Sequence, residues 1–236
     1  MTLTTEQARK TRFELIGRIT AGLAHEMSGP LGIAIGFTEL AKDTLAAGGN
    51  GAVDGQVAAK VTQYLGLIES SSKRARDLSR AISDFAKAKP GQVEQADLRE
   101  MVTNAAMLSN PAVRSGMLDI VPGEESPETI VIADRALTLQ ALVQLMLASM
   151  EAFPEGGTIR WEVDAVDGEG RFVLTGEPTP EAASQEWPVD EDVRAAFASQ
   201  GGSLGPAVSK VLSGEDGAIA AAPAWIVTGT LPVVAG

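Results

Sequence analysis

The stretch that decides the fold is residues 16–34, which read IGRITAGLAHEMSGPLGIA. Its apolar residues recur at steps of three and four, as one face of an α-helix requires. They are Ile16, Ile19, Leu23, Met27, Leu31 and Ala34. The periodicity extends over residues 6–47 and predicts one long helix, which ends at the Gly-rich run 48–51.

A second helical pattern follows from about Gln56 to Lys89, where Pro90-Gly91 ends it. Its apolar residues lie close to a heptad spacing. Two long helices joined by a short Gly-rich loop predict an antiparallel hairpin over residues 1–90. A lone hairpin leaves part of both apolar stripes in water, so we expect two copies to pair as a dimeric four-helix bundle.

After Pro90 short strands alternate with helices, which predicts an α/β sandwich over residues 91–236 and an α+β class for the whole chain. The helices are expected at 97–108, 134–153 and 203–213. The strands are expected at 117–121, 129–133, 158–166, 171–176, 217–222 and 224–234, with a turn at Asp167-Gly168 and a loop over 177–192.

Composition excludes several kinds of site. The chain of 236 residues has no cysteine and one histidine, so it has no disulfide, thiol nucleophile or His-rich metal site of its own. Residues 1–90 carry 12 basic and 9 acidic side chains, whereas residues 91–236 carry 7 and 22. The acidic net charge of −12 argues against a nucleic-acid partner. No targeting segment or membrane helix is expected, so we expect a cytoplasmic protein.

The single histidine, His25, is the candidate functional residue. At about 100° per residue it lies opposite the apolar face of the first helix and points away from the bundle core. Glu26 can accept a hydrogen bond from one ring nitrogen and raise the nucleophilicity of the other. The surrounding face is a candidate docking surface made of Arg18, Ala21, Gly22, Gly29, Gly32 and Gly36. Small residues allow another protein to approach closely; close helix packing, or a histidine without a role, are the alternatives.

The stretch Ala24-His25-Glu26-Met27-Ser28-Gly29-Pro30-Leu31 resembles the phosphoacceptor motif of bacterial sensor histidine kinases. The second helix is similar to the partner helix of their dimerisation and phosphotransfer domain. Residues 134–157 resemble their nucleotide-binding helix and the turn after it, and residues 203–217 resemble their last helix. The resemblance implies a kinase-like core with His25 as the phosphoacceptor.

The nucleotide site departs from that family. In the family that it resembles, the nucleotide-binding helix carries Asn residues, one of which helps to hold Mg²⁺. The corresponding positions of this chain are Gln144 and Ala148. The segment that should carry the adenine-binding Asp-x-Gly-x-Gly reads Thr-Gly-Glu-Pro-Thr-Pro at 175–180, and only residues 201–205 remain of the Gly-rich loop. Gly29 replaces the family's Asn before Pro, which argues against phosphatase activity.

These features resemble bacterial histidine phosphotransferases that look like a kinase dimer with a degenerate ATP-binding domain. The resemblance implies a homodimer that passes a phosphoryl group between receiver domains of response regulators through His25, with Glu26 as orienter. It implies no cofactor of the chain's own, since the receiver supplies Mg²⁺. Two alternatives stay open: a non-catalytic regulator that binds a kinase or response regulator, and an atypical ATP-dependent sensor kinase.

Overall fold

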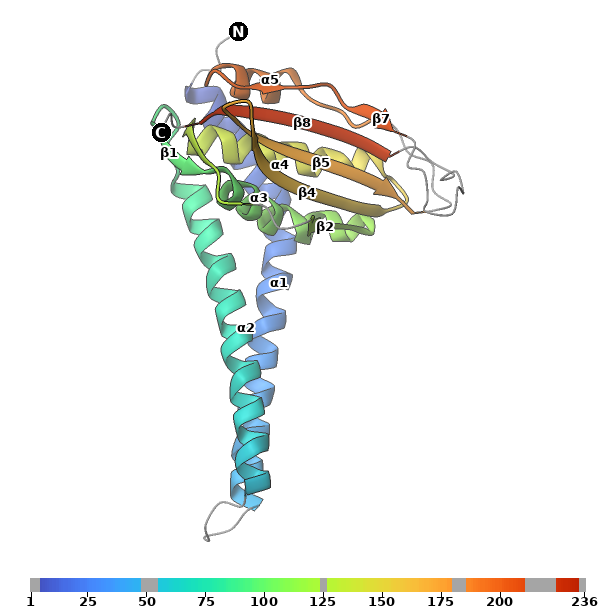
Figure 1. Ribbon diagram of the computed structural model, residues 1–236. Helices are drawn as coiled ribbons and strands as arrows, with labels where there is room; N and C mark the ends of the chain where they lie inside the picture. The colour runs from blue at the N-terminus through green and yellow to red at the C-terminus, as the bar shows by residue number, and fades with distance from the viewer. Residues whose placement is uncertain (1–4, 48–54, 124–126, 180–185, 211–223, 234–236) are drawn as a thin grey trace.

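The computed structural model describes residues 5–47, 55–123, 127–179, 186–210 and 224–233. Helices α1 (Thr5–Ala47) and α2 (Gly55–Lys87) run antiparallel and form a long stalk below a sandwich of strands and helices (Figure 1). Both predicted helices are confirmed to within two residues. No helix in these ranges is both long and apolar enough to cross a membrane.

The stalk leaves much of its apolar surface uncovered within one chain. The exposed large apolar side chains of the two helices are Phe13, Leu31, Ile33, Ile35, Leu40, Leu45, Leu65 and Leu67. Helices with this much uncovered apolar surface ordinarily bury it against a partner. The predicted four-helix bundle of two copies is consistent with this stripe and stays a prediction.

The sandwich is built on a six-stranded sheet with the order β2-β4-β5-β8-β6, and β7 also pairs with β8. Strand β2 is parallel to β4, and the other pairs are antiparallel. The strands are β2 (Leu118–Pro122), β4 (Gly157–Val166), β5 (Glu169–Pro178), β6 (Ser203–Leu204), β7 (Val208–Lys210) and β8 (Ala224–Pro232). The predicted turn between β4 and β5 is confirmed: Asp167 and Gly168 have φ of 54° and 81°, as a two-residue hairpin turn requires.

Helices cover one face of this sheet. Helices α3 (Leu98–Val113) and α4 (Arg135–Ala152) pack on each other behind the sheet, and α5 (Glu191–Ala198) packs on α4 (Figure 1). Helices α3 and α4 each begin after a capping aspartate: the Asp97 side chain accepts from Arg99 N, and the Asp134 side chain accepts from Ala136 N and Leu137 N. Twelve of the 18 residues of α4 are buried, as its strongly apolar sequence predicts.

Three predictions for the sandwich need correction, and the structure adds one strand that was not predicted. The helix expected at 203–213 is wrong over the described residues 203–210, which form β6 and β7. The loop expected at 177–192 gives way to α5 at Glu191, and residues 93–97 form a strand, β1 (Val93–Asp97), that pairs with β3 (Ile130–Asp134). Helix α3 continues through Pro111 to Val113 rather than ending at 108. The strand expected at 217–222 lies outside the described residues.

Pairing with a distant strand explains the error at 203–210. Strand β8 offers an edge to which both β6 and β7 add, and Gly202 lies so close to Thr230 O that no side chain fits there. Gly201 has a φ of 77°, which most residues avoid and which separates α5 from β6. The spacing of apolar residues within 203–213 gives no information about these contacts with distant residues.

The upper part of α1 packs on the sandwich, so the stalk and the sandwich share a core. Arg12 is buried at this junction and donates a hydrogen bond to Ala88 O. Burial lowers the pKa of the Arg12 guanidinium, and the charge of Asp134 opposes that effect. The division predicted at residue 90 lies between α2 and β1 and stays a prediction.

Candidate functional site

Helix α1 carries the candidate site at the level where it passes the end of α3. His25 and Ala21 belong to this helix, but their side chains lie outside those that the structure describes. The neighbouring Glu26 is described in full, and its side chain is only 21% exposed. A carboxylate in such a position needs cationic or hydrogen-bonding partners, because burial penalises its charge.

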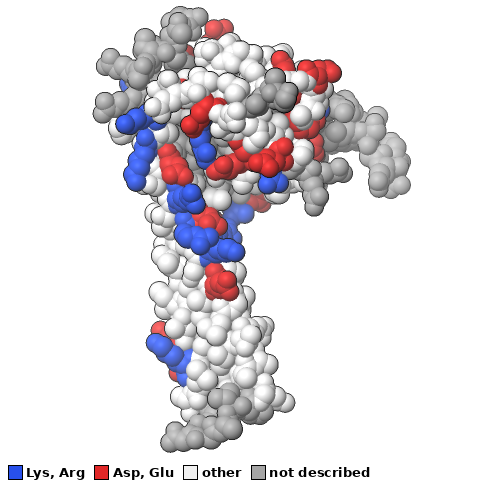
Figure 2. Space-filling view, turned by 60° about the vertical axis from the view of Figure 1, so that its left-hand side comes forward, with Lys and Arg blue, Asp and Glu red and all other residues white. Residues whose placement is uncertain are grey.

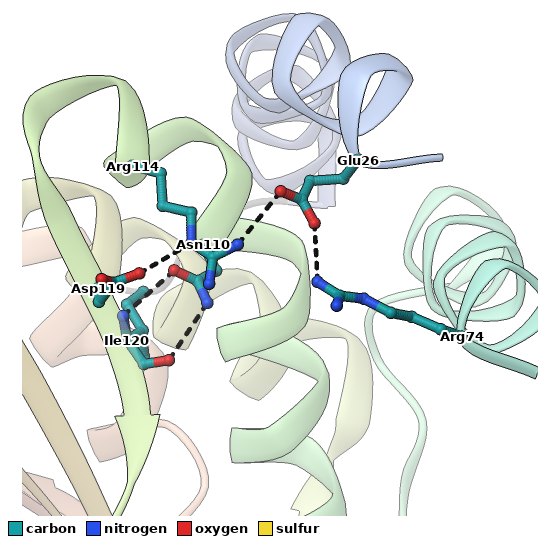
Figure 3. Close-up of polar contacts among 6 residues, drawn as sticks. All are labelled: Glu26, Arg74, Asn110, Arg114, Asp119 and Ile120. Carbon is teal, nitrogen blue, oxygen red and sulfur yellow. Dashed lines mark hydrogen bonds and ion pairs between the residues drawn. The ribbon is translucent and has the colours of Figure 1, made fainter. Parts of the chain in front are cut away.

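Two arginines from different parts of the fold supply these partners (Figure 3). Arg74 Nη2, from α2, lies 3.0 Å from Glu26 Oε2. Arg114 Nη1, from the turn η1 (Arg114–Gly116) that follows α3, lies 3.2 Å from Glu26 Oε1. Glu26 therefore links the two helices of the stalk to the sandwich. Each carboxylate oxygen retains a lone pair, so the expected contact with the imidazole stays possible and is a prediction.

Arg114 is itself held in place. Its Nε donates to Asp119 Oδ1 of β2 at 2.8 Å. This hydrogen bond, aided by the charges of Asp119 and Glu26, raises the pKa of the Arg114 guanidinium, although partial burial acts in the opposite direction. Asn110 fastens β2 to α3 by accepting from Ile120 N and donating to Ile120 O, both at 3.2 Å (Figure 3).

The glycines of the expected docking face divide into two groups. A Cβ atom on Gly22 would lie 2.8 Å from the backbone C and O atoms of Pro111, so Gly22 is a close packing contact with α3. Close packing was the alternative to docking at this face, and it applies to Gly22. Gly29, Gly32 and Gly36 have open space where a Cβ would be added. Arg18 lies exposed two turns before His25.

This difference predicts opposite effects for two alanine substitutions. Gly22→Ala should destabilise the chain by about 1–3 kcal/mol, because α1 must move from the Pro111 backbone. Gly32→Ala, on the same helix, should stabilise it by up to about 1 kcal/mol through helix propensity. Thermal unfolding followed by circular dichroism measures both. A Gly22→Ala variant as stable as Gly32→Ala would contradict the packing of α1 on α3.

A groove between α1 and α2 begins at Glu26 and runs toward the tip of the stalk. It has a volume of about 480 Å³ and is lined by Glu26, Gly29, Pro30, Ile33, Ser70, Ser71 and Arg74. An adjoining cavity of about 400 Å³ reaches under α3 and includes Lys73, Leu78, Met107 and Pro111 in its lining. Figure 2 shows Lys and Arg side chains gathered where the stalk meets the sandwich. The groove that begins at Glu26 is therefore bordered by small residues, Gly29, Ser70 and Ser71. The positive charges of Lys73 and Arg74 flank it.

The residues that the resemblance assigns to a nucleotide lie in a closely packed part of the sandwich. Gln144 borders a cavity of only about 10 Å³, closed by Thr11 of α1 and by Asp192 and Ala196 of α5. Small-molecule sites are ordinarily about 300–1,000 Å³. Ala148, which is half-buried, has no oxygen for a hard cation.

Aromatic rings fill the space between α4 and the end of β5. A Cβ on Gly176 would lie 2.3 Å from the Phe153 ring and 3.0 Å from the Trp187 ring. Trp187 is 1% exposed and donates from Nε1 to Leu145 O of α4 at 3.0 Å. Its ring meets Phe153 edge to face, with centroids 5.9 Å apart. These rings lie between the helix and the strand that the resemblance assigns to the nucleotide site. Over the described ranges, no cluster of three or more acidic or histidine side chains is arranged to hold a metal ion.

Sequence reasoning missed the role of Arg114. Arg74 belongs to a basic stretch on the second helix that is ordinarily a solvated face, and nothing near position 114 marks a site. Only their convergence on Glu26, from positions 48 and 88 residues away, identifies both.

Comparison with known proteins finds a matching domain family and several relatives. Residues 15–91 match the His Kinase A (phospho-acceptor) domain family. The C4-dicarboxylate transport sensor protein DctS of Rhodobacter capsulatus is 30% identical over 152 residues, which are 63% of this chain and 22% of that protein. The signal transduction histidine-protein kinase AtoS of Escherichia coli strain K12 is 21% identical over 65% of this chain and 23% of its own length.

This chain thus spans about a fifth of the length of these two relatives. Among solved structures, histidine kinase ThkA in complex with response regulator protein TrrA is 19% identical over 97% of this chain and 65% of that one, with a TM-score of 0.46. This TM-score is too low to support an argument about function. From the family match and the sequence relatives, the chain has a histidine-kinase-like core that contains a phosphoacceptor domain.

Proposed function

We propose that the chain is a histidine phosphotransferase that moves a phosphoryl group between the aspartates of two receiver domains through His25. The observation that carries the proposal is that one part of the kinase-like core is retained and another part is altered. The phosphoacceptor domain retains His25-Glu26 beside an open groove, whereas the region assigned to nucleotide is filled by Trp187 and Phe153. A site that accepts phosphoryl but does not fit ATP needs another phosphorylated donor.

The reaction balances without ATP. A neutral imidazole nitrogen of His25 attacks the phosphorus of an aspartyl phosphate; the P–O bond to the receiver breaks and a P–N bond forms. The aspartate leaves as a carboxylate, and the second ring nitrogen keeps its proton. Transfer onto the second receiver reverses these steps. Such transfer depends on positioning and on electrostatic stabilisation of the phosphoryl oxygens.

The surface beside His25 suits an acidic receiver site. Gly29 and Gly32 let a partner backbone come close to α1, and the groove lined by Ile33 and Ser71 offers room for its side chains. Lys73 and Arg74 supply positive charge, which would attract the carboxylates that hold Mg²⁺ in the receiver. Mg²⁺ comes from the receiver in this proposal, and the exposed apolar stripe of the stalk pairs with a second copy.

Radiolabel transfer tests the proposal. The purified chain is incubated with [γ-³²P]ATP and Mg²⁺, and separately with a panel of ³²P-phosphorylated receiver domains. We expect no label from ATP and acid-labile label from at least one receiver, passed on when a second receiver is added. Label from ATP alone would overturn the proposal in favour of a kinase. Label from no receiver in the panel would overturn it in favour of a regulator that only binds.

A further inference from the structure

We infer that Arg114, a residue of the sandwich, is a positioning residue of the phosphoacceptor site and acts on His25 through Glu26. The inference rests on the proposed role of His25 as the phosphoryl carrier. It gives the sandwich a function in transfer that requires no nucleotide.

The first argument is the geometry of the bridge. Arg74 and Arg114 contact different oxygens of the Glu26 carboxylate, one from the stalk and one from the sandwich. Two donors on opposite oxygens restrict rotation of the carboxyl group, which a single ion pair does not. A carboxylate that is fixed in this way presents its free lone pairs in a constant direction. An imidazole one residue away needs such a fixed acceptor to stay in one tautomer.

The second argument is that Arg114 is anchored more firmly than Arg74. The Arg114 side chain is 45% exposed and also bonds Asp119, whereas the Arg74 side chain is 65% exposed. The Asn110 clamp on Ile120 fixes the strand that carries Asp119. One turn earlier on α1, Gly22 rests on the Pro111 backbone. The end of α3 is therefore tied to β2 by Asn110 and contacts α1 at Gly22, one turn before position 25.

The third argument is electrostatic. The charged groups around this carboxylate are Lys73, Arg74 and Asp77 of α2, and Arg114 and Asp119 of the sandwich. Removing Arg114 takes away a positive charge and leaves Glu26 less neutralised. Both changes favour the imidazolium form of His25, which has no lone pair for attack. The loss of Arg114 should therefore lower the fraction of reactive imidazole near neutral pH.

The test uses the fact that the chain has one histidine, so its imidazole NMR signals belong to His25 without further assignment. The full chain is titrated as wild type, Arg114→Gln and Arg114→Lys. We expect Arg114→Gln to raise the pKa of the imidazole by about half a unit to one unit, and Arg114→Lys to raise it less. Arg80→Gln is the matched control, because its guanidinium pairs with Asp84 elsewhere on α2. This control should titrate like wild type.

Reactivity is measured in parallel with phosphoramidate, a small donor that phosphorylates imidazole without any receiver. Arg114→Gln should slow phosphorylation at saturating donor by about twofold to threefold at pH 7, as the smaller neutral fraction of the imidazole requires. The half-saturating concentration should stay unchanged, and Arg114→Lys should recover part of the rate. Arg114→Met, which keeps the length of the side chain and removes its charge, should act in the same direction as Arg114→Gln and provides a second variant if that one does not fold.

An Arg114→Gln variant that is folded and matches wild type in both titration and rate would overturn the inference. So would a loss of rate with an unchanged titration and no recovery in Arg114→Lys, because this is the pattern of a merely structural contact. If these effects appear but no receiver labels His25, the relay fails while the positioning role stands.

Discussion

Replacing His25 by glutamine is expected to abolish the proposed phosphoryl transfer from receiver to chain and from chain to receiver. The substitution removes the one imidazole of the chain, and no cysteine is present to act as a substitute nucleophile. Glutamine is similar in size and polar, but its amide nitrogen has no lone pair available for attack. The transfer rate should fall by at least about a thousandfold. The measurement is acid-labile ³²P on the chain after incubation with a phosphorylated receiver.

The variant must stay folded and still bind for this result to be informative. Position 25 lies in the middle of α1, and glutamine is a good helix former. We therefore expect unchanged circular dichroism and unchanged receiver binding by calorimetry. Glu26→Gln is the companion variant, which keeps the nucleophile and removes the carboxylate, and should retain measurable transfer. A His25→Gln chain that relays phosphoryl at the wild-type rate would exclude His25 as the carrier.

Replacing Trp187 by alanine destabilises the sandwich by about 3–5 kcal/mol, the usual range for removal of a buried tryptophan. The ring lies between α4 and β5 at 1% exposure, so its loss leaves a cavity beside Phe153. It also removes the hydrogen bond from Nε1 to Leu145 O. For a chain of this size the melting temperature should fall by about 10 °C. Calorimetry or circular dichroism on heating measures this shift.

Trp187→Phe keeps an aromatic ring in this space but removes the hydrogen-bond donor and part of the ring volume. Its expected loss is about 1–3 kcal/mol, smaller than that of the alanine variant. A Trp187→Ala chain that melts within about 2 °C of wild type would contradict the packing of residue 187 into the core. Millimolar Mg-ATP should raise the melting temperature of neither wild type nor variant, because a ligand stabilises only a state that binds it. A rise in wild type would show that the nucleotide region opens.

Local patterns were sufficient for the parts of the fold that are regular. The steps of three and four in α1 and α2, the apolar run of α4 and the Asp167-Gly168 turn each specify an element through residues that lie close together along the chain. The motif around His25 likewise lies within one helix. For this reason the stalk and the β4–β5 hairpin could be predicted, and the resemblance that assigns His25 as phosphoacceptor rests on a single helix.

Contacts between distant segments decided the rest. Residues 203–210 became strands because the edge of β8 was available, and residues 93–97 became a strand because β3 lay beside them. Gly22 belongs to the packing of α1 because α3 ends against it, whereas Gly32 does not. Whether these residues form a strand, or whether a glycine is a packing contact, depends on segments that are distant in the sequence. A local sequence pattern does not include those segments and therefore does not predict the outcome.

The sequence by itself determined the two-helix stalk, the sandwich class and His25 as the candidate phosphoacceptor, because each depends on residue types at short spacing. Only the tertiary structure decided the surroundings of Glu26. Arg74 and Arg114 reach that carboxylate from the second helix and from the sandwich, and Trp187 reaches the space behind α4 from beyond β5. Ion pairs and ring packing act over a few ångströms in space, whatever the separation along the chain.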